Sequence, residues 1–161
     1  MIVHAGLVST YLHGSWRGVL IEGASGAGKS DLALRLLDQG FRLVADDRVL
    51  LWACDGALYG RAPDTLANLI EVRGLGICPE PALPFSRVVL AARCEPAERL
   101  PDPAHNAYVG LSVPAISIHP LEPSAPAKLR RALQHLGRGA EGAYLGDLAA
   151  GVSPRPGGDS R

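Results

Sequence analysis

The sequence predicts an α/β domain built around a mixed central β-sheet, and three observations indicate this class. An apolar run at residues 19–22 ends at a glycine-rich loop, and a segment of helical periodicity follows directly. A second apolar run, at residues 41–45, ends on two aspartates. Further short apolar runs in the second half are separated by proline and glycine. Strands that alternate with helices in this way are typical of α/β folds.

The first half of the chain is predicted to contain a strand–helix–strand unit. Its helix covers residues 30–39, where the apolar side chains recur at helical spacing, and Gly40 is suited to end that helix. The strand before the helix and the strand after it are the two apolar runs at 19–22 and 41–45. Other strands are expected at 7–11, 49–53 and 57–59.

The second half is predicted to add strands and one helix. Residues 69–73 form a strand or run directly into the glycines that follow, and 86–93 and 115–118 are further strands. A helix is expected at 126–136, with Ser124 as its N-cap and Pro126 in its first turn.

Length and composition limit the possible functions. Sixteen basic and sixteen acidic residues in 161 give no net charge, which argues against a long basic surface for nucleic acid. No apolar run is long enough to span a membrane, and no signal-peptide pattern opens the chain. The three cysteines form no C-x-x-C pair and are expected to be reduced. We therefore expect a cytoplasmic protein without nucleic-acid or membrane partners.

The chain is expected to divide into a folded domain at residues 1–140 and a tail at 141–161. From residue 137 to the end there are seven glycines, two prolines and few large apolar side chains. Such a composition buries too little apolar surface to offset the entropy of ordering, so the tail is predicted to be disordered.

The strongest chemical signal is the stretch Gly23-Ala24-Ser25-Gly26-Ala27-Gly28-Lys29-Ser30, which matches G-x-x-x-x-G-K-[ST], the P-loop pattern. Glycines let the backbone approach phosphate oxygens, and the loop N–H groups and the helix N-terminus favour an anion. Lys29 is predicted to reach the β- and γ-phosphates, and Ser30 to ligate Mg²⁺. Since the stretch lies between a predicted strand and a predicted helix, we predict nucleoside-triphosphate binding. No N-K-x-D is present, which argues against a guanine-specific switch.

Asp46 and Asp47 follow the next predicted strand, where ligands of open α/β sheets gather. Adjacent residues on an extended chain point in opposite directions. One carboxylate can therefore face the phosphates while the other caps the turn or binds Arg48. We predict that one of the two is a general base that accepts a hydroxyl proton, and the alternative is an exposed acidic turn.

Three stretches together resemble the HPr kinase/phosphorylase family. They are the loop just described, Leu43-Val44-Ala45-Asp46-Asp47-Arg48-Val49, and Ile70-Glu71-Val72-Arg73-Gly74-Leu75-Gly76-Ile77, which is similar to the family's signature segment. The resemblance covers residues 2–136 and corresponds to the catalytic C-terminal domain. It is similar to the short alphaproteobacterial forms, which share the stretch at 124–130. The implied fold is a P-loop kinase domain of the HPr kinase/PEP carboxykinase-like type.

The resemblance implies a reaction and a partner. The ATP γ-phosphoryl group, with Mg²⁺, is transferred to a serine of HPr, a small phosphocarrier protein of the phosphotransferase system. Many members also catalyse phosphorolysis of the phosphoserine, which forms pyrophosphate. Residues 113–117 lack the arginine and glycine of the P-V-R-P-G-R-N-like stretch linked to that reverse reaction. Family members form hexamers, so a homo-oligomer is implied.

The resemblance also implies roles for individual residues. Asp47 matches the aspartate that takes and returns the proton, with Asp46 beside it. Glu71 matches an acid associated with Mg²⁺, which Ser30 also binds. The other implied catalytic residues are Lys29, His4, with His13 as a second candidate, and Arg99. On the residues alone, Glu71 is equally well explained as an ordinary acid at a strand end, His4 as a strand histidine and Arg99 as a surface arginine.

Two further functions stay open at this point. One is a kinase that uses the same loop to phosphorylate a small molecule, although the chain has little room for the lid and acceptor domain of a nucleoside kinase. The other is a regulatory module that binds a nucleotide without catalysis.

Overall fold

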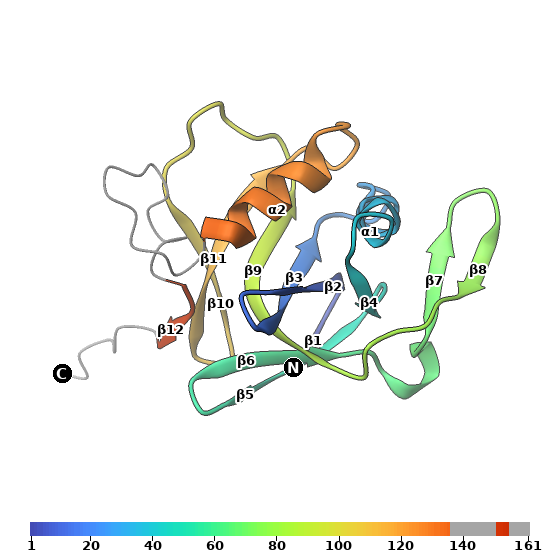
Figure 1. The fold of residues 1–161 in the computed structure, drawn as a ribbon, viewed down its shortest axis with the longest axis horizontal. Helices are drawn as coiled ribbons and strands as arrows, with labels where there is room; N and C mark the ends of the chain where they lie inside the picture. The colour runs from blue at the N-terminus through green and yellow to red at the C-terminus, as the bar shows by residue number, and fades with distance from the viewer. Residues whose placement is uncertain (136–150, 155–161) are drawn as a thin grey trace.

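The computed structural model describes residues 1–135 and 151–154 of the chain. The main structure in these residues is a ten-stranded mixed sheet. Two α-helices in these residues pack on one face of the sheet, which curls strongly (Figure 1). The predicted α/β class with a mixed sheet is therefore confirmed.

The strand–helix–strand unit forms around a β-hairpin. β2 (Ala5–Leu12) and β3 (Ser15–Glu22) are antiparallel and joined by His13 and Gly14, whose φ angles are +53° and +80°. Both values suit the type I′ turn that joins two-residue hairpins. Because the hairpin also pairs residues 15–17, which precede the apolar run, β3 starts earlier than predicted.

The helix and the strand after it lie close to their predicted bounds. α1 (Lys29–Leu37) ends where Phe41 N–H bonds back to the carbonyl of Leu36 across Gly40, which has φ +86°. This is the helix ending that the glycine predicted. β4 (Arg42–Ala45) then pairs antiparallel with β2. β3 and β4 are thus parallel to each other with β2 between them.

The remaining strands extend the sheet on both sides of this unit. Seven strands are hydrogen-bonded to their neighbours in the order β1-β5-β6-β9-β3-β2-β4. β11 also pairs with β9, and β10 and β12 pair with β11. The bounds are β1 (Ile2–Val3), β5 (Val49–Cys54), β6 (Ala57–Arg61), β9 (Ser86–Cys94), β10 (Ala104–Tyr108), β11 (Leu111–Ile118) and β12 (Ser153–Pro154).

The long strand β9 gives the sheet its curl. Its first residues pair antiparallel with β6, whereas its later residues pair parallel with β3 on one side and with β11 on the other. β3, β9 and β11 are parallel, so their carboxyl ends lie at one edge of the sheet (Figure 1). The loops that follow these three strands therefore surround the same region.

A second, two-stranded sheet stands apart from the main one. After the short 3₁₀ helix η1 (Asp64–Leu66), β7 (Leu69–Val72) pairs antiparallel with β8 (Gly76–Pro79), and the hairpin projects from the domain (Figure 1). The sequence therefore forms a strand at 69–72, followed by a turn at the glycines. β1, β8, β10 and β12 were not predicted, because they are short or polar and depend on a partner strand.

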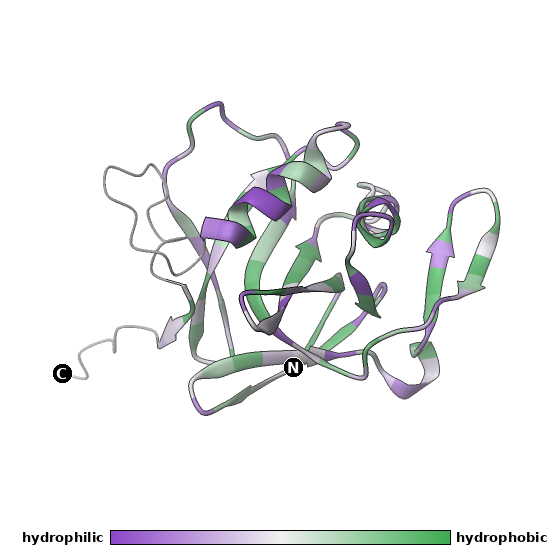
Figure 2. Cartoon of the chain, viewed as in Figure 1, coloured by the Kyte–Doolittle hydropathy of each residue, from purple (hydrophilic) through white to green (hydrophobic). Residues whose placement is uncertain are grey.

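α2 (Ala125–His135) confirms the second predicted helix. Ser124 precedes it, and its carbonyl accepts the Lys128 N–H at 2.9 Å. Leu136, the predicted last residue, lies outside the described residues. In Figure 2 the turns of α2 alternate between hydrophilic and hydrophobic residues, while β3 and β9 are mostly hydrophobic.

The sheet is buried on both faces, as the consecutive apolar residues of β3 predict. Val19 and Ile21 face α1 and α2, whereas Leu20 faces the opposite core. The larger side chains of the helix-side core are Val8, Val19, Ile21, Leu32, Leu36, Phe41, Leu43, Ile70, Leu90, Ile118, Leu129 and Leu133. Those of the opposite core include Leu7, Leu20, Val44, Val49, Leu51, Leu58, Val88, Leu111 and Val113. Two packed cores hold β3 rigidly, and the glycine-rich loop begins where β3 ends.

The predicted tail at 141–161 lies outside the described residues, except for 151–154. There, Ser153 and Pro154 form β12 and pair with Ser112 and Leu111 of β11. Among the described helices, none is both long enough and apolar enough to cross a membrane.

Candidate active site

The glycine-rich loop, residues 23–30, connects β3 to the first turn of α1. Gly26 and Gly28 have φ angles of +80° and +105°, which other residues adopt only with strain. The Ala27 N–H bonds to the Ala24 carbonyl at 3.0 Å, so the loop turns back on itself. Backbone N–H groups and the N-terminus of α1 then lie around one concave region, which suits an anion.

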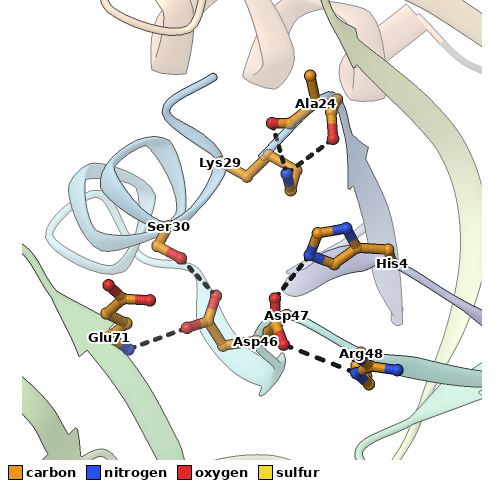
Figure 3. Close-up of polar contacts among 9 residues, drawn as sticks. His4, Ala24, Lys29, Ser30, Asp46, Asp47, Arg48 and Glu71 are labelled. Carbon is orange, nitrogen blue, oxygen red and sulfur yellow. Dashed lines mark hydrogen bonds and ion pairs between the residues drawn. The ribbon is translucent and has the colours of Figure 1, made fainter. Parts of the chain in front are cut away.

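Lys29 is held inside this loop. Its side chain is only 8% exposed, and its ammonium donates to the carbonyls of Gly23 at 2.7 Å and Ala24 at 2.9 Å (Figure 3). These carbonyls satisfy a buried charge that no carboxylate neutralises within the contacts of the described residues. The positive charge is therefore kept at the loop, where a phosphate group would neutralise it.

The start of the loop is packed tightly against β9. A Cβ atom on Gly23 would come within 2.8 Å of the Cβ of Cys94, so only glycine fits there. Burial raises the pKa of the Cys94 thiol to about 11, although the nearby charge of Lys29 opposes the shift. The thiol is thus neutral near pH 7 and adds no negative charge beneath the loop.

Asp46 is the buried member of the aspartate pair. It is 6% exposed, and both of its carboxylate oxygens accept hydrogen bonds. The Ser30 hydroxyl donates to Oδ1 at 2.8 Å, and the Glu71 backbone N–H donates to Oδ2 at 2.9 Å (Figure 3). Asp46 therefore joins the first turn of α1 to strand β7.

Asp47 is the exposed member of the pair, and its backbone is in a left-handed conformation with φ +68°. The Arg48 N–H bonds to the Asp46 carbonyl at 2.8 Å, which closes a tight three-residue turn around Asp47. Its Oδ1 lies 2.7 Å from Nε2 of His4, and its Oδ2 lies 3.8 Å from Nε of Arg48. The turn aims the Asp47 carboxylate away from Asp46, as the opposite directions of neighbouring residues predict (Figure 3).

His4 reaches Asp47 because the chain bends between β1 and β2. The Ala5 N–H bonds to the Asp47 carbonyl at 3.1 Å, so the backbones of the two segments are joined beside the side-chain contact. His13, the second candidate, lies at the other end of β2, in the turn of the hairpin. The geometry therefore brings His4, and not His13, to the aspartates.

These groups surround a pocket of about 270 Å³. Of the predicted site residues, it is lined by His4, Ser25, Gly26, Gly28, Lys29, Ser30, Asp47 and Glu71. Asp46 does not line the pocket, but it hydrogen-bonds to Ser30 and Glu71, which do. The other loop residues, Gly23, Ala24 and Ala27, do not line it either, and the Ala27 N–H bonds to the Ala24 carbonyl within the loop. Arg99 does not line the pocket and is exposed in the segment after β9.

Two lining residues were not predicted for this site, Asp31 and Arg73. Arg73 lies two residues after Glu71, a spacing that places both side chains on one side of the β7 segment. This spacing from Glu71 is the feature of the sequence that could have indicated that Arg73 lies at the site. Asp31 is the residue after Ser30, and its carboxylate accepts from Nε of Arg35 at 3.0 Å.

The oxygen atoms at this site are of the kind that Mg²⁺ prefers. Ser30 Oγ, the Asp46 carboxylate and the Glu71 side chain are hard oxygen donors beside the loop. Within the described residues, no three His, Cys, Asp or Glu side chains gather closely enough to hold a metal ion by themselves. Mg²⁺ commonly binds through one or two carboxylates together with substrate phosphates and water, and this set of residues fits that mode.

Known proteins with this arrangement define the class of fold. The structure is similar to that of the Hpr(Ser) kinase/phosphatase from Coxiella burnetii, with a TM-score of 0.68 and 27% sequence identity, over 81% of this chain and 95% of that one. The curled mixed sheet is thus the fold of an HPr(Ser) kinase/phosphatase.

The sequence comparisons point to the same proteins. Residues 1–80 match the family model described as HPr Serine kinase C-terminal domain. The HPr kinase/phosphorylase of Streptococcus thermophilus is 51% identical over 76 residues, which are 47% of this chain and 23% of that protein. The protein of the same name from Clostridium beijerinckii is 51% identical over 73 residues, or 42% of this chain and 24% of its own length. The chain therefore spans about a quarter of the curated relatives that it matches, and the resemblance seen in the sequence is confirmed.

Proposed function

We propose that this protein is an ATP-dependent kinase that phosphorylates a serine of an HPr-type phosphocarrier protein. The observation that carries the proposal is the placement of Asp47, paired with His4, across one pocket from Lys29 and Ser30. A phosphate-binding loop and a candidate base that share a pocket are what transfer of a phosphoryl group to a hydroxyl requires. The curated relatives that carry this region are named HPr kinase/phosphorylase.

The glycine-rich loop is proposed to act as a P-loop for ATP. Its N–H groups and the N-terminus of α1 would surround the β-phosphate, and Lys29 would exchange its two carbonyl partners for phosphate oxygens. Because Lys29 is already positioned by those carbonyls, the loop needs little rearrangement to bind.

Ser30, Asp46 and Glu71 are proposed to hold Mg²⁺. When bound, Mg²⁺ supplies charge neutralisation for the phosphate oxygens. The Ser30 hydroxyl now donates to Asp46 at 2.8 Å, so the two groups lie close enough to share one ion. Glu71 is fixed beside them because its N–H bonds to the second Asp46 oxygen.

Asp47 is proposed to be the general base. It would accept the proton of the serine hydroxyl as the serine oxygen forms its bond to the γ-phosphorus, while the bond to the bridging oxygen breaks and ADP leaves with the electron pair. His4 holds the carboxylate in place through the 2.7 Å contact with Oδ1. Arg73 lines the pocket and would add positive charge near the transferred group, whereas Arg99 can do so only if the loop after β9 moves.

The reverse reaction is a second candidate because the curated relatives are named phosphorylases as well as kinases. It would require inorganic phosphate in the same pocket, with Asp47 returning its proton to the serine oxygen. Release of pyrophosphate from phosphoserine-HPr and inorganic phosphate would measure it directly.

A labelling assay tests the proposal. The full chain, Mg²⁺ and γ-labelled ATP are incubated with purified HPr, and the labelled residue is identified. We expect label on a serine of HPr, and a loss of both ATP affinity and rate in Lys29→Ala, because the loop charge is removed. Label on a small molecule alone would favour a small-molecule kinase. ATP binding without any transfer would favour a regulatory module.

A further inference from the structure

The loop between β11 and α2 carries an exposed apolar surface next to the glycine-rich loop. A Cβ atom on Gly28 would lie 3.1 Å from the side chain of Leu121 and 3.5 Å from that of Pro120, so both side chains lie close to Gly28, which lines the pocket. Leu121 is nevertheless 69% exposed. We call Pro120 and Leu121 the apolar shelf.

The apolar shelf is held rigidly by α1. Arg35 donates to the carbonyls of Pro120 and Glu122, on either side of Leu121, and also to the carboxylate of Asp31. Lys128 of α2 bonds to the Glu122 side chain at 2.8 Å. Leu121 is therefore exposed on a segment whose position is fixed by hydrogen bonds from α1 and α2. An apolar surface that is held in place beside a polar pocket suits a ligand with an apolar part.

The position of the acids shows which part of a nucleotide would reach this surface. Asp46, Asp47, His4 and Glu71 lie on one side of Lys29, and the chain at Ala24 lies on the other (Figure 3). Under the proposed function, the γ-phosphate points toward the acids. The nucleoside at the other end of the triphosphate must then leave on the opposite side of the loop, where the segments after β9 and β11 lie.

Those two segments are joined to each other. The Ala97 N–H donates to Nε2 of His119 at 3.3 Å, and the Glu95 N–H donates to the carbonyl of Ile118 at 3.3 Å. Both segments follow parallel strands that end at the same sheet edge as β3. Ligands of α/β sheets bind outside such carboxyl ends.

We infer that the apolar shelf, Pro120 and Leu121, is the surface on which the nucleoside base packs. This inference rests on the proposed function and adds to it a base-binding site outside the family-matched residues 1–80. The Leu121 side chain has no hydrogen-bonding group, so it recognises the apolar face of a base and not its polar edge. ATP and GTP should therefore bind with similar affinity.

Calorimetric titration of the full chain with ATP, GTP and tripolyphosphate, each with Mg²⁺, tests the inference. Tripolyphosphate measures the phosphate site alone. We expect Leu121→Ala to weaken ATP and GTP binding by about threefold, with tripolyphosphate binding unchanged. Because the carboxylate in Leu121→Asp lies beside Gly28 and also repels phosphate, this variant should weaken ATP and GTP binding about tenfold more than it weakens tripolyphosphate binding. GTP should bind the unchanged protein within about fivefold of ATP. Leu75→Ala is the matched control, since Leu75 is 79% exposed on the β7–β8 hairpin and does not line the pocket.

The outcomes separate the two proposals. If the unchanged protein binds neither ATP nor tripolyphosphate, the proposed function fails. The inference alone is overturned if ATP binds no more tightly than tripolyphosphate, or if Leu121→Asp weakens ATP binding no more than it weakens tripolyphosphate binding. A GTP affinity more than about fiftyfold below that of ATP would also overturn it, because a polar group would then be reading the base edge.

Discussion

Asp46 and Asp47 are adjacent in the chain but lie in two different environments. Asp46 is buried, and each carboxylate oxygen accepts a hydrogen bond from another element. Asp47 is about half exposed, has a left-handed backbone, and contacts His4 at the pocket. The difference shows that two adjacent aspartates in one turn have different structural roles. The first aspartate joins α1 to β7, and the second presents its carboxylate at the pocket.

The largest expected effect comes from Asp47→Asn. The amide keeps the size of the side chain but cannot accept the serine proton, so phosphoryl transfer to HPr should fall by about 10²- to 10⁴-fold. ATP affinity should change by less than about threefold, because Asp47 lies away from the loop carbonyls and N–H groups. Initial rates with labelled ATP and calorimetric titration measure the two quantities. Asp38→Asn, at an exposed aspartate after α1, is the control, and an unchanged rate in Asp47→Asn would exclude Asp47 as the base.

Asp46→Asn is expected to affect ATP binding and folding more than Asp47→Asn does, although both effects are smaller than the loss of transfer in Asp47→Asn. An amide oxygen can accept from Ser30 or from the Glu71 N–H, but its NH₂ group cannot accept from the other. The lost bond should lower the free energy of unfolding by about 1–3 kcal/mol, and the lost charge should weaken Mg²⁺-dependent ATP binding by about tenfold. Urea unfolding and titrations with and without Mg²⁺ measure these effects.

Ser30→Ala is the matched control for Asp46→Asn, because it removes one of the two donors and leaves the carboxylate in place. It should cost less stability than Asp46→Asn. Equal stability of Asp46→Asn and the unchanged protein would show that Asp46 does not join the two elements.

The smallest expected effect concerns the backbone of Asp47. At φ +68° a residue with a Cβ atom is strained by about 1–2 kcal/mol, and glycine is not. Asp47→Gly should therefore be more stable than Asp47→Ala by about 1 kcal/mol in urea unfolding, although both lack the carboxylate and both should lose transfer activity. If the two variants unfold at the same urea concentration, the turn at Asp47 stores no strain.

The sequence predicted the central unit of the fold because its signals are local. The apolar run of β3, the periodic leucines of α1 and the glycine after it each depend on residues that are close in the chain. β10 could not be predicted in this way, since its sequence Ala-His-Asn-Ala-Tyr carries no apolar pattern and becomes a strand by pairing with β11. β8 likewise depends on β7.

The site was predicted in part for the same reason. The loop motif indicated which residues surround one side of the pocket, and the resemblance pointed to His4, which the structure places 2.7 Å from Asp47. Arg73, whose spacing from Glu71 was a usable signal, lines the pocket although it was not predicted, and nothing in the spacing indicated that Arg99 lies outside it. It also did not indicate that the backbone N–H of Glu71, and not only its carboxylate, has a role at Asp46.

By itself, the sequence determined the α/β class, the glycine-rich loop that ends at Lys29 and Ser30, and the pair of aspartates, because these features depend on local backbone geometry and charge. The tertiary structure decided which aspartate is buried and which faces His4, because their surroundings come from β2, α1 and β7. It also decided that Leu121, remote in sequence, lies against Gly28. This contact arises because β3 and β11, both parallel to β9, bring the segments that follow them to one edge of the sheet.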